Sequence, residues 1–211
     1  MKTVAIESQK GGTGKTTTAL NLAVAAEHAG QAAVVIDLDP QASAAGWKDT
    51  RPGDTPVVVS VAPARLAQAL QVAKDGGADL VLIDTAPHAE SAALAAAKAA
   101  DLILIPCRPG ILDLRAISTT ADVAKIAGKP AFVVLNAMPP GATRLIADAR
   151  AAVAVHGLDV APVVIEQRAA FGHALTAGQT AQEFEPHGKA AKEIAVLYRW
   201  LRAQLQQSEI A

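Results

Sequence analysis

The sequence predicts an α/β protein with a doubly wound, mainly parallel sheet of about seven strands and helices on both faces. Three observations lead to this fold class. Short apolar runs recur along the chain and are dense in Val, Ile and Leu without polar alternation, as is typical of strands covered on both sides. Alanine- and leucine-rich stretches of helical length lie between them. Glycines follow several of these stretches, where helix C-terminal caps belong.

The apolar runs predict buried strands at 3–7, 33–37, 57–62, 79–84, 101–106, 131–136 and 160–165. The stretches between them predict helices at 15–29, 63–75, 88–99, 113–127, 143–156 and 187–207. Four of the helices are followed by cap glycines, at Gly30, Gly76-Gly77, Gly128 and Gly157. Regular alternation of strand and helix indicates parallel pairing, and we find no linker or internal repeat.

Length and composition narrow the function. The 211 residues, 51% of them hydrophobic, suit a single domain over 1–211 with a sizeable core. The net charge of −1 gives no global attraction to nucleic acid or membrane, so any polyanion must bind a local patch. One cysteine, Cys107, excludes an internal disulfide framework and fits a reducing compartment. No signal peptide or membrane-spanning run is found, so we expect a cytoplasmic protein.

The most informative stretch joins the first strand to the first helix. Thr3–Ile6 is apolar, ESQKGGTGKTTT follows at Glu7–Thr18, and a helix comes next. This order of strand, glycine loop and helix is the context of a phosphate-binding loop. Lys15 is expected to reach the β- and γ-phosphates of a nucleotide, and the Thr16 hydroxyl to bind Mg²⁺. The other nucleotide-binding residues predicted here are Gly11, Gly12, Thr13, Gly14 and Thr17.

The loop departs from the common spacing G-x-x-x-x-G-K-[ST]. It reads K-G-G-x-G-K-T, with a second lysine, Lys10, at its front. This resembles the deviant phosphate-binding loop of the ParA/MinD family of ATPases. The resemblance implies that Lys10 reaches across a dimer interface to the partner's nucleotide. A solvated loop charge is the alternative for Lys10.

Two later strands end in carboxylates. Asp37 and Asp39 stand two residues apart in D-L-D-P-Q, so beside a triphosphate one can serve Mg²⁺ and the other the attacking water. The same run resembles the family's second nucleotide motif, which implies the metal role for Asp37 and the water role for Asp39. Asp84, in D-T-A-P, closes an apolar strand as a Walker B aspartate does and is the third expected metal residue. Turn or helix-capping roles are the alternatives for all three.

The remaining site expectations come from the second half of the chain. Asn136 ends a strand and, by the resemblance, pairs with the adenine edge; a turn-forming Asn is the alternative. Arg108 or Arg115 could contact phosphate or partner, or be exposed. A basic surface for DNA is expected from residues near and on the last helix. These are Arg168, Lys189, Lys192, Arg199 and Arg202, for which a merely solvated surface is an equal alternative.

The resemblance covers nearly the whole chain, and the set of motifs is more specific than any one of them. It implies a protein close to short ParA-type partition ATPases without an N-terminal DNA-binding domain. Such an ATPase uses ATP and Mg²⁺, dimerises with ATP, binds double-stranded DNA nonspecifically and hydrolyses ATP slowly under stimulation by a ParB-like or other adaptor protein. It would partition plasmid or chromosome DNA or position a cellular cargo, and it would lie on the nucleoid when ATP is bound.

Three other classes stay open. A MinD-like membrane-cycling regulator would use the stripe Ile194, Leu197, Leu201 and Leu205 as a membrane face, although packing on the sheet is the favoured interpretation. A metabolic enzyme of the superfamily would need a small-molecule acid, and the nitrogenase-iron-protein type needs two cluster cysteines. A nucleotide-gated scaffold would bind ATP without hydrolysis.

Overall fold

The apolar runs form one all-parallel sheet in the computed structural model, which describes residues 1–207 apart from the side chains of residues 111–116. The strands are β1 (Lys2–Ile6), β2 (Ala33–Asp37), β3 (Val57–Ser60), β4 (Leu80–Asp84), β5 (Leu102–Cys107), β6 (Ala131–Leu135) and β7 (Asp159–Val160). Their order across the sheet is β3-β2-β4-β1-β5-β6-β7, and every pair is parallel. The predicted fold class is confirmed.

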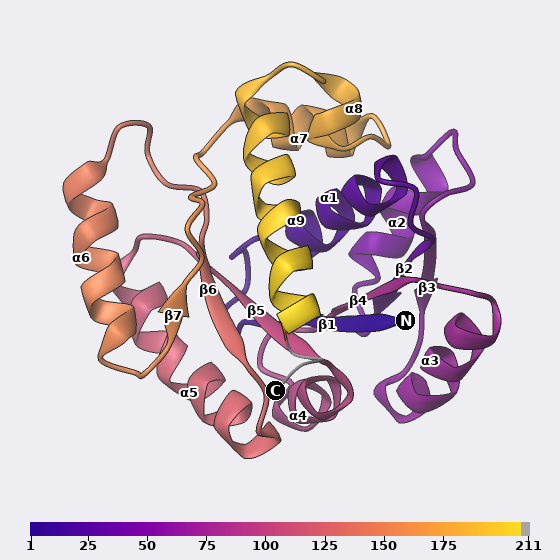
Figure 1. Ribbon diagram of the computed structural model, residues 1–211, viewed down its shortest axis with the longest axis horizontal. Helices are drawn as coiled ribbons and strands as arrows, with labels where there is room; N and C mark the ends of the chain where they lie inside the picture. The colour runs from indigo at the N-terminus through magenta and orange to yellow at the C-terminus, as the bar shows by residue number, and fades with distance from the viewer. Residues whose placement is uncertain (208–211) are drawn as a thin grey trace.

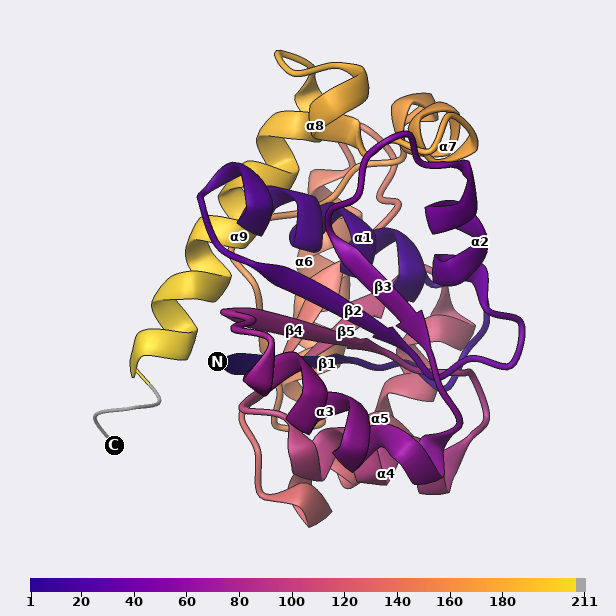
Figure 2. The same ribbon diagram turned by 90° about the vertical axis from the view of Figure 1, so that its right-hand side faces the viewer.

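Helices cover both faces of this sheet (Figures 1 and 2). On one face α1 (Lys15–His28) and α9 (Lys189–Gln207) pack on the strands, with α2 (Ser43–Thr50), α7 (Ala169–Thr176) and α8 (Ala181–Phe184) beside them. The opposite face carries α3 (Leu66–Asp75), α4 (Glu90–Ala99), α5 (Ile111–Ala127) and α6 (Thr143–Ala154), and a short 3₁₀ turn, Pro63–Arg65, precedes α3. Each face has its own cluster of buried apolar side chains, as expected for parallel strands.

The strand register places two of the predicted acidic residues, Asp37 and Asp84, next to each other. Ile6 at the end of β1 pairs with Asp84 of β4, and Asp84 pairs with Asp37 of β2. The three residues thus form one row across neighbouring strands at the carboxyl edge of the sheet. In open α/β sheets this edge is where ligands bind.

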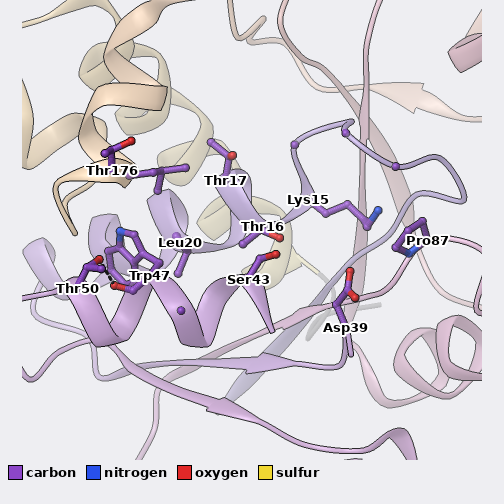
Figure 3. A pocket seen from close by; sticks show the side chains of 15 residues that line it. Lys15, Thr16, Thr17, Leu20, Asp39, Ser43, Trp47, Thr50, Pro87 and Thr176 are labelled. Carbon is purple, nitrogen blue, oxygen red and sulfur yellow. Dashed lines mark hydrogen bonds between the residues drawn. The ribbon is translucent and has the colours of Figure 1, made fainter. Parts of the chain in front are cut away.

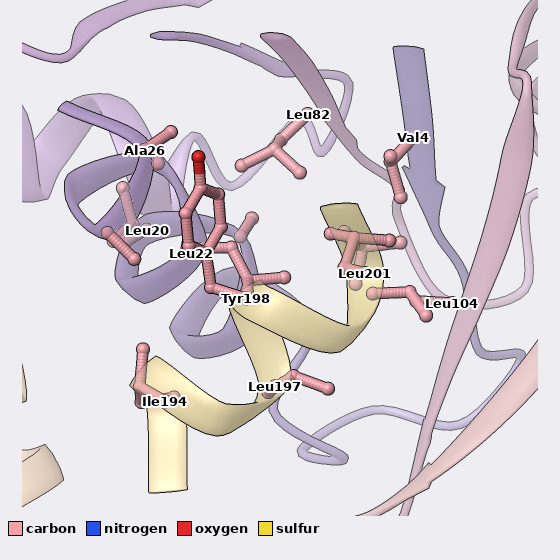
Figure 4. Close-up of a cluster of buried hydrophobic side chains, with 14 of the residues drawn as sticks. Val4, Leu20, Leu22, Ala26, Leu82, Leu104, Ile194, Leu197, Tyr198 and Leu201 are labelled. Carbon is pink, nitrogen blue, oxygen red and sulfur yellow. The ribbon is translucent and has the colours of Figure 1, made fainter. Parts of the chain in front are cut away.

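The last helix settles one of the open alternatives. Ile194, Leu197, Leu201 and Leu205 are each at most 4% exposed and belong to the core cluster that includes α1 and the sheet. Figure 4 shows the first three of them, with Tyr198, turned toward α1 and the strands. The predicted packing of this stripe is confirmed, and these side chains offer no membrane face. Within residues 1–207 no helix is long and apolar enough to cross a bilayer.

The structure differs from the predicted elements in two places. The strand expected at 160–165 is regular only over Asp159–Val160, because Pro162 has no N–H to donate, although Ile165 N–H still reaches Leu135 O at 2.9 Å. Helices α2, α7 and α8 were not predicted. They are at most eight residues long, which is too short for a helical pattern of apolar residues to be recognised in the sequence.

Candidate functional site

The glycine loop joins β1 to α1 at the centre of the sheet. Gly14 is the N-cap of α1 and has a φ of 96°, in the left-handed region. A Cβ built on Gly14 would lie 2.2 Å from Nδ2 of Asn136. That amide donates to the carbonyl of Thr13 at 2.7 Å, so Asn136 supports the loop from behind. Only glycine fits at position 14, and Asn136 has a structural role that its sequence position did not reveal.

Lys15 begins α1 and is 7% exposed. Its ammonium donates to the carbonyl of Lys10 at 3.2 Å, across the loop. Burial lowers the pKa of Lys15, while the carboxylates of Asp84 and Asp39 act in the opposite direction. The ammonium of Lys15 is thus buried and donates to a neutral carbonyl oxygen. A charged phosphate oxygen would be a stronger hydrogen-bond acceptor for it.

Thr16 and Asp84 meet where a cation would be expected. The Thr16 hydroxyl donates to Oδ2 of Asp84 at 2.6 Å, and the other oxygen of Asp84 has no hydrogen-bond partner among the described residues. Burial raises the pKa of Asp84, which is 1% exposed, to about 7. A hydroxyl and a carboxylate oxygen are donors that Mg²⁺ prefers. No group of three or more His, Cys, Asp or Glu side chains that could hold a metal ion is found among the described residues.

Asp37 is fully buried and binds backbone N–H groups. Its Oδ1 accepts from Asp39 N and its Oδ2 from Ala44 N, both at 2.9 Å. Burial raises the pKa of Asp37, although these N–H groups act against the rise. The side chain thus fixes the turn after β2 and the first residues of α2, and its place in the metal shell stays a prediction.

Asp39 is half-buried and lines a cavity of about 630 Å³ that begins at the glycine loop. Its Oδ1 accepts from Gln41 N at 2.9 Å, which orients the carboxylate locally. Figure 3 shows Lys15, Asp39 and Pro87 at one end of this cavity. The far end is lined by residues of α1, α2 and α7 that the sequence did not single out: Leu20, Ser43, Gly46, Trp47, Thr50, Leu175 and Thr176.

A smaller cavity of about 180 Å³ lies on the other side of the loop. Asn136 and Gln167 line it together with Phe171, as do Gly12 and Gly14 of the loop. The side-chain amides of Asn136 and Gln167 can form hydrogen bonds with the edge of a planar base. We therefore propose that the base of the nucleotide lies in this smaller cavity. Arg108 is exposed at its rim, and the side chain of Arg115 lies outside the described residues.

Arg168 also lines the smaller cavity, and two carboxylates compensate its charge. It lies 2.6 Å from Glu193 and 2.7 Å from Glu166, with 19% of its side chain exposed. The hydrogen bond to Glu193 is the main cause that raises the pKa of Arg168. Lys189, Lys192, Arg199 and Arg202 are exposed along α9. These four cations are therefore better candidates than Arg168 for contacts with DNA phosphates.

Glu7 follows β1 directly and is an unusual buried acid. It is 1% exposed, and neither carboxyl oxygen has a hydrogen-bond partner among the described residues. Burial raises its pKa from 4.5 to about 8, so the folded protein keeps this carboxyl protonated near neutral pH.

This acid predicts a pH dependence of folding stability. Above pH 4.5 the unfolded chain loses the Glu7 proton while the folded chain keeps it up to about pH 8, so stability falls between these values. The full effect is on the order of 3–5 kcal/mol. The free energy of unfolding of Glu7→Gln, measured with urea, should not fall between pH 4.5 and pH 8. At pH 8.5 the variant should be more stable than the wild type. Glu90→Gln, at an exposed site on α4, is the control. A pH profile of Glu7→Gln parallel to that of wild type would contradict the prediction.

A parallel sheet with a glycine loop between its central strand and a helix, and with carboxylates on the two next strands, defines a P-loop nucleotide-binding protein. Comparison with known proteins specifies the family. The profile of the CobQ/CobB/MinD/ParA nucleotide binding domain matches residues 4–181. The chain belongs to this family.

Similar proteins agree with this assignment. Maintenance of carboxysome distribution protein A of Gloeobacter kilaueensis is 32% identical over 98% of this chain and 94% of its own length. The chromosome-partitioning ATPase Soj of Thermus thermophilus is 27% identical over 99% of this chain and 98% of its own. Among solved structures, the septum site-determining protein MinD of Pyrococcus horikoshii OT3, complexed with Mg-ADP, has a TM-score of 0.76 at 22% identity, with 95% of each chain covered. The two curated relatives thus match over nearly their whole length, and the solved structure shares the fold.

Proposed function

We propose that residues 1–211 form a ParA-type ATPase that converts ATP to ADP and phosphate slowly, dimerises with ATP, binds DNA nonspecifically and positions a cellular cargo. One observation carries the proposal: the loop K-G-G-T-G-K-T puts Lys15 and Thr16 at one end of a cavity that Asp39 also lines, and Thr16 is bonded to the buried carboxyl of Asp84. Two full-length relatives, named for carboxysome distribution and chromosome partitioning, support the cargo role.

The proposed residue roles combine these contacts with the resemblance to the family. Lys15 exchanges the carbonyl of Lys10 for phosphate oxygens, and the loop amides hold the same anion. Thr16 and Asp84 would hold Mg²⁺, which would neutralise charge on the phosphates. Asp39, which Gln41 N–H orients, positions the attacking water. Lys10 of the second copy completes the charge balance, so an isolated copy turns over slowly.

The cavity argues against a metabolic ligase. Among the described residues that line it, only Lys15 and Asp39 carry charge. An enzyme that phosphorylates a small acid needs a further cation to hold the acid's carboxylate. The far end instead presents Trp47, Leu20 and hydroxyl groups. Burial of the α9 stripe likewise removes the feature that favoured a MinD-like membrane regulator.

A filter-binding assay tests the DNA proposal. With ATP and Mg²⁺ the protein should retain duplex DNA of any sequence, with affinity falling steeply as salt increases. Lys192→Glu with Arg199→Glu should weaken binding and make the salt slope shallower by about one unit per lost phosphate contact. Lys98→Glu, exposed on α4 at the opposite face of the sheet, is the control.

Two results would contradict this proposal. One is DNA retention that is independent of ATP, and the other is co-sedimentation with anionic liposomes in place of DNA. A failure to release phosphate from ATP would contradict the hydrolytic reaction itself.

A further inference from the structure

Helix α2 lines the large cavity together with the glycine loop, and it is anchored at both ends. At its start, Asp37 accepts the N–H of Ala44. At its end, the guanidinium of Arg51 binds Glu183, with Nη2 at 2.6 Å from Oε1 and Nη1 at 2.9 Å from Oε2. Only 9% of the Arg51 side chain and 20% of that of Glu183 are exposed. A bidentate pair with so little exposure fixes geometry more firmly than a surface ion pair.

Other contacts fix the same end of α2. Arg51 donates to the carbonyls of Gly178 at 3.1 Å and Thr55 at 2.6 Å, and its guanidinium lies 4.8 Å from the centre of the Trp47 ring. Trp47, on α2, donates its ring N–H to the carbonyl of Gln179 at 3.1 Å. The turn between α7 and α8 thus packs against the last turn of α2.

The fit of this turn against α2 is close. Gly178 has a φ of 67°, and a Cβ there would lie 2.5 Å from the carbonyl oxygen of Thr50. Glu183 also accepts the N–H and hydroxyl of Thr180, which forms a capping box at the start of α8. Glu183 therefore holds its own turn and Arg51 together.

The segment that joins β2 to α2 contains Asp39, and it is short and held by several hydrogen bonds. Five residues, 38–42, separate β2 from α2. Within them Asp39 N–H bonds to Asp37, Gln41 N–H bonds to the Asp39 carboxylate, and Ala42 N–H bonds to the Asp39 carbonyl at 2.8 Å. Ala42 has a φ of 49°, which strains a residue that carries a Cβ. The position of α2 and that of the Asp39 carboxylate are therefore linked through a short, hydrogen-bonded segment.

We propose that Arg51 and Glu183 are a positioning pair for ATP hydrolysis: they hold α2 so that the Asp39 carboxylate stays at the phosphate end of the cavity. This inference rests on the proposed ATPase activity. The groups assigned to the phosphates and metal, Lys15, Thr16 and Asp84, lie on α1 and β4 and make no contact with Arg51 in the bonds described above. The pair consequently sets the rate of hydrolysis and leaves nucleotide affinity nearly unchanged.

Arg51→Met tests the pair, because methionine keeps much of the apolar stem and removes the charge and its hydrogen bonds. We expect kcat to fall roughly 10- to 100-fold, since small misplacements of a reacting group have effects of this size. The Kd for an ATP analogue with Mg²⁺ should stay within about twofold. Arg51→Lys, which keeps the charge but not the fork, should give an intermediate kcat. Arg150→Gln is the control: Arg150 lies on α6, at the other edge of the sheet (Figure 1), and the change removes its hydrogen bond to the carbonyl of Ala161.

A second variant guards against simple misfolding. Glu183→Gln keeps a side chain that suits the capping box, and it should lower kcat as well. The double variant Arg51→Met with Glu183→Gln should lose no more than the stronger single variant, because both changes break one interaction. Melting temperatures of all variants are measured in parallel.

The outcomes separate this inference from the proposed function. A wild-type protein that releases no phosphate contradicts the ATPase proposal. A wild-type protein that hydrolyses ATP while folded Arg51→Met matches its kcat overturns only the positioning pair. Equal losses in kcat and in affinity, or an Arg51→Lys no faster than Arg51→Met, also overturn it, because the change would then not act through Asp39.

Discussion

Asp39→Ala is expected to lower phosphate release at least about 10²-fold while Mg²⁺ and ATP still bind, since a positioned acid or base contributes 10²- to 10⁴-fold. The reason lies in the cavity. Asp39 faces its phosphate end beside Lys15, whereas Asp37 is enclosed and occupied by backbone N–H groups (Figure 3). The variant should therefore accumulate as an ATP-bound dimer. Single-turnover phosphate release and size-exclusion chromatography with ATP measure the two effects.

Two companion variants sharpen this test. Asp39→Asn keeps an oxygen that can accept from Gln41 N–H, so it preserves the turn and removes only the charge. It should lose hydrolysis nearly as completely as Asp39→Ala. Asp49→Ala removes an exposed carboxylate of α2 and should hydrolyse ATP like wild type. Undiminished phosphate release from Asp39→Asn would show that another group positions the water.

Lys10→Ala should bind ATP but lose the ATP-dependent dimer. The backbone carbonyl of Lys10, which the substitution keeps, is the group that accepts from Lys15, so the loop should retain its shape. What is lost is a side-chain cation that we propose reaches the phosphates of the second copy. Analytical ultracentrifugation with a nonhydrolysable analogue should give a monomer for Lys10→Ala and a dimer for wild type.

The controls for this prediction use two other lysines. Lys15→Ala should fail to bind the nucleotide at all, because it removes the cation inside the same loop. Lys98→Ala, in the last turn of α4, should dimerise normally. A normal ATP-dependent dimer of Lys10→Ala would contradict the role of Lys10 across the interface.

The sequence predicted the sheet and the glycine loop because the patterns that indicate them involve residues close together in the chain. Continuous Val/Ile/Leu runs, cap glycines and the order of strand, glycines and helix do not depend on distant residues. The sequence also placed Asp37 and Asp84 at the carboxyl ends of two strands, and parallel strands end at the same edge of a sheet. The carboxylates could therefore be assigned to one site before their distances were known.

Other parts of the site depend on contacts between distant residues. Helix α2 is short and contains Gly46, so its own propensity is weak. It is stabilised by the cap from Asp37 and by Trp47 and Arg51, which bind the α7–α8 turn more than 120 positions later in the chain. The pairing of Arg168 with Glu193 and the burial of Glu7 are equally non-local. The periodicity of apolar residues along the chain does not indicate contacts of this kind.

The sequence by itself determined the class of fold, the phosphate loop with its two lysines, and the three aspartates at strand ends. Each of these follows from residues close together in the chain. Only the tertiary structure decided that Asp37 anchors α2 while Asp39 faces the cavity, that Asn136 supports Gly14, and that Arg51 joins α2 to Glu183. The physical reason is that a side chain's role depends on which donors and charges surround it, and folding brings those neighbours from remote positions.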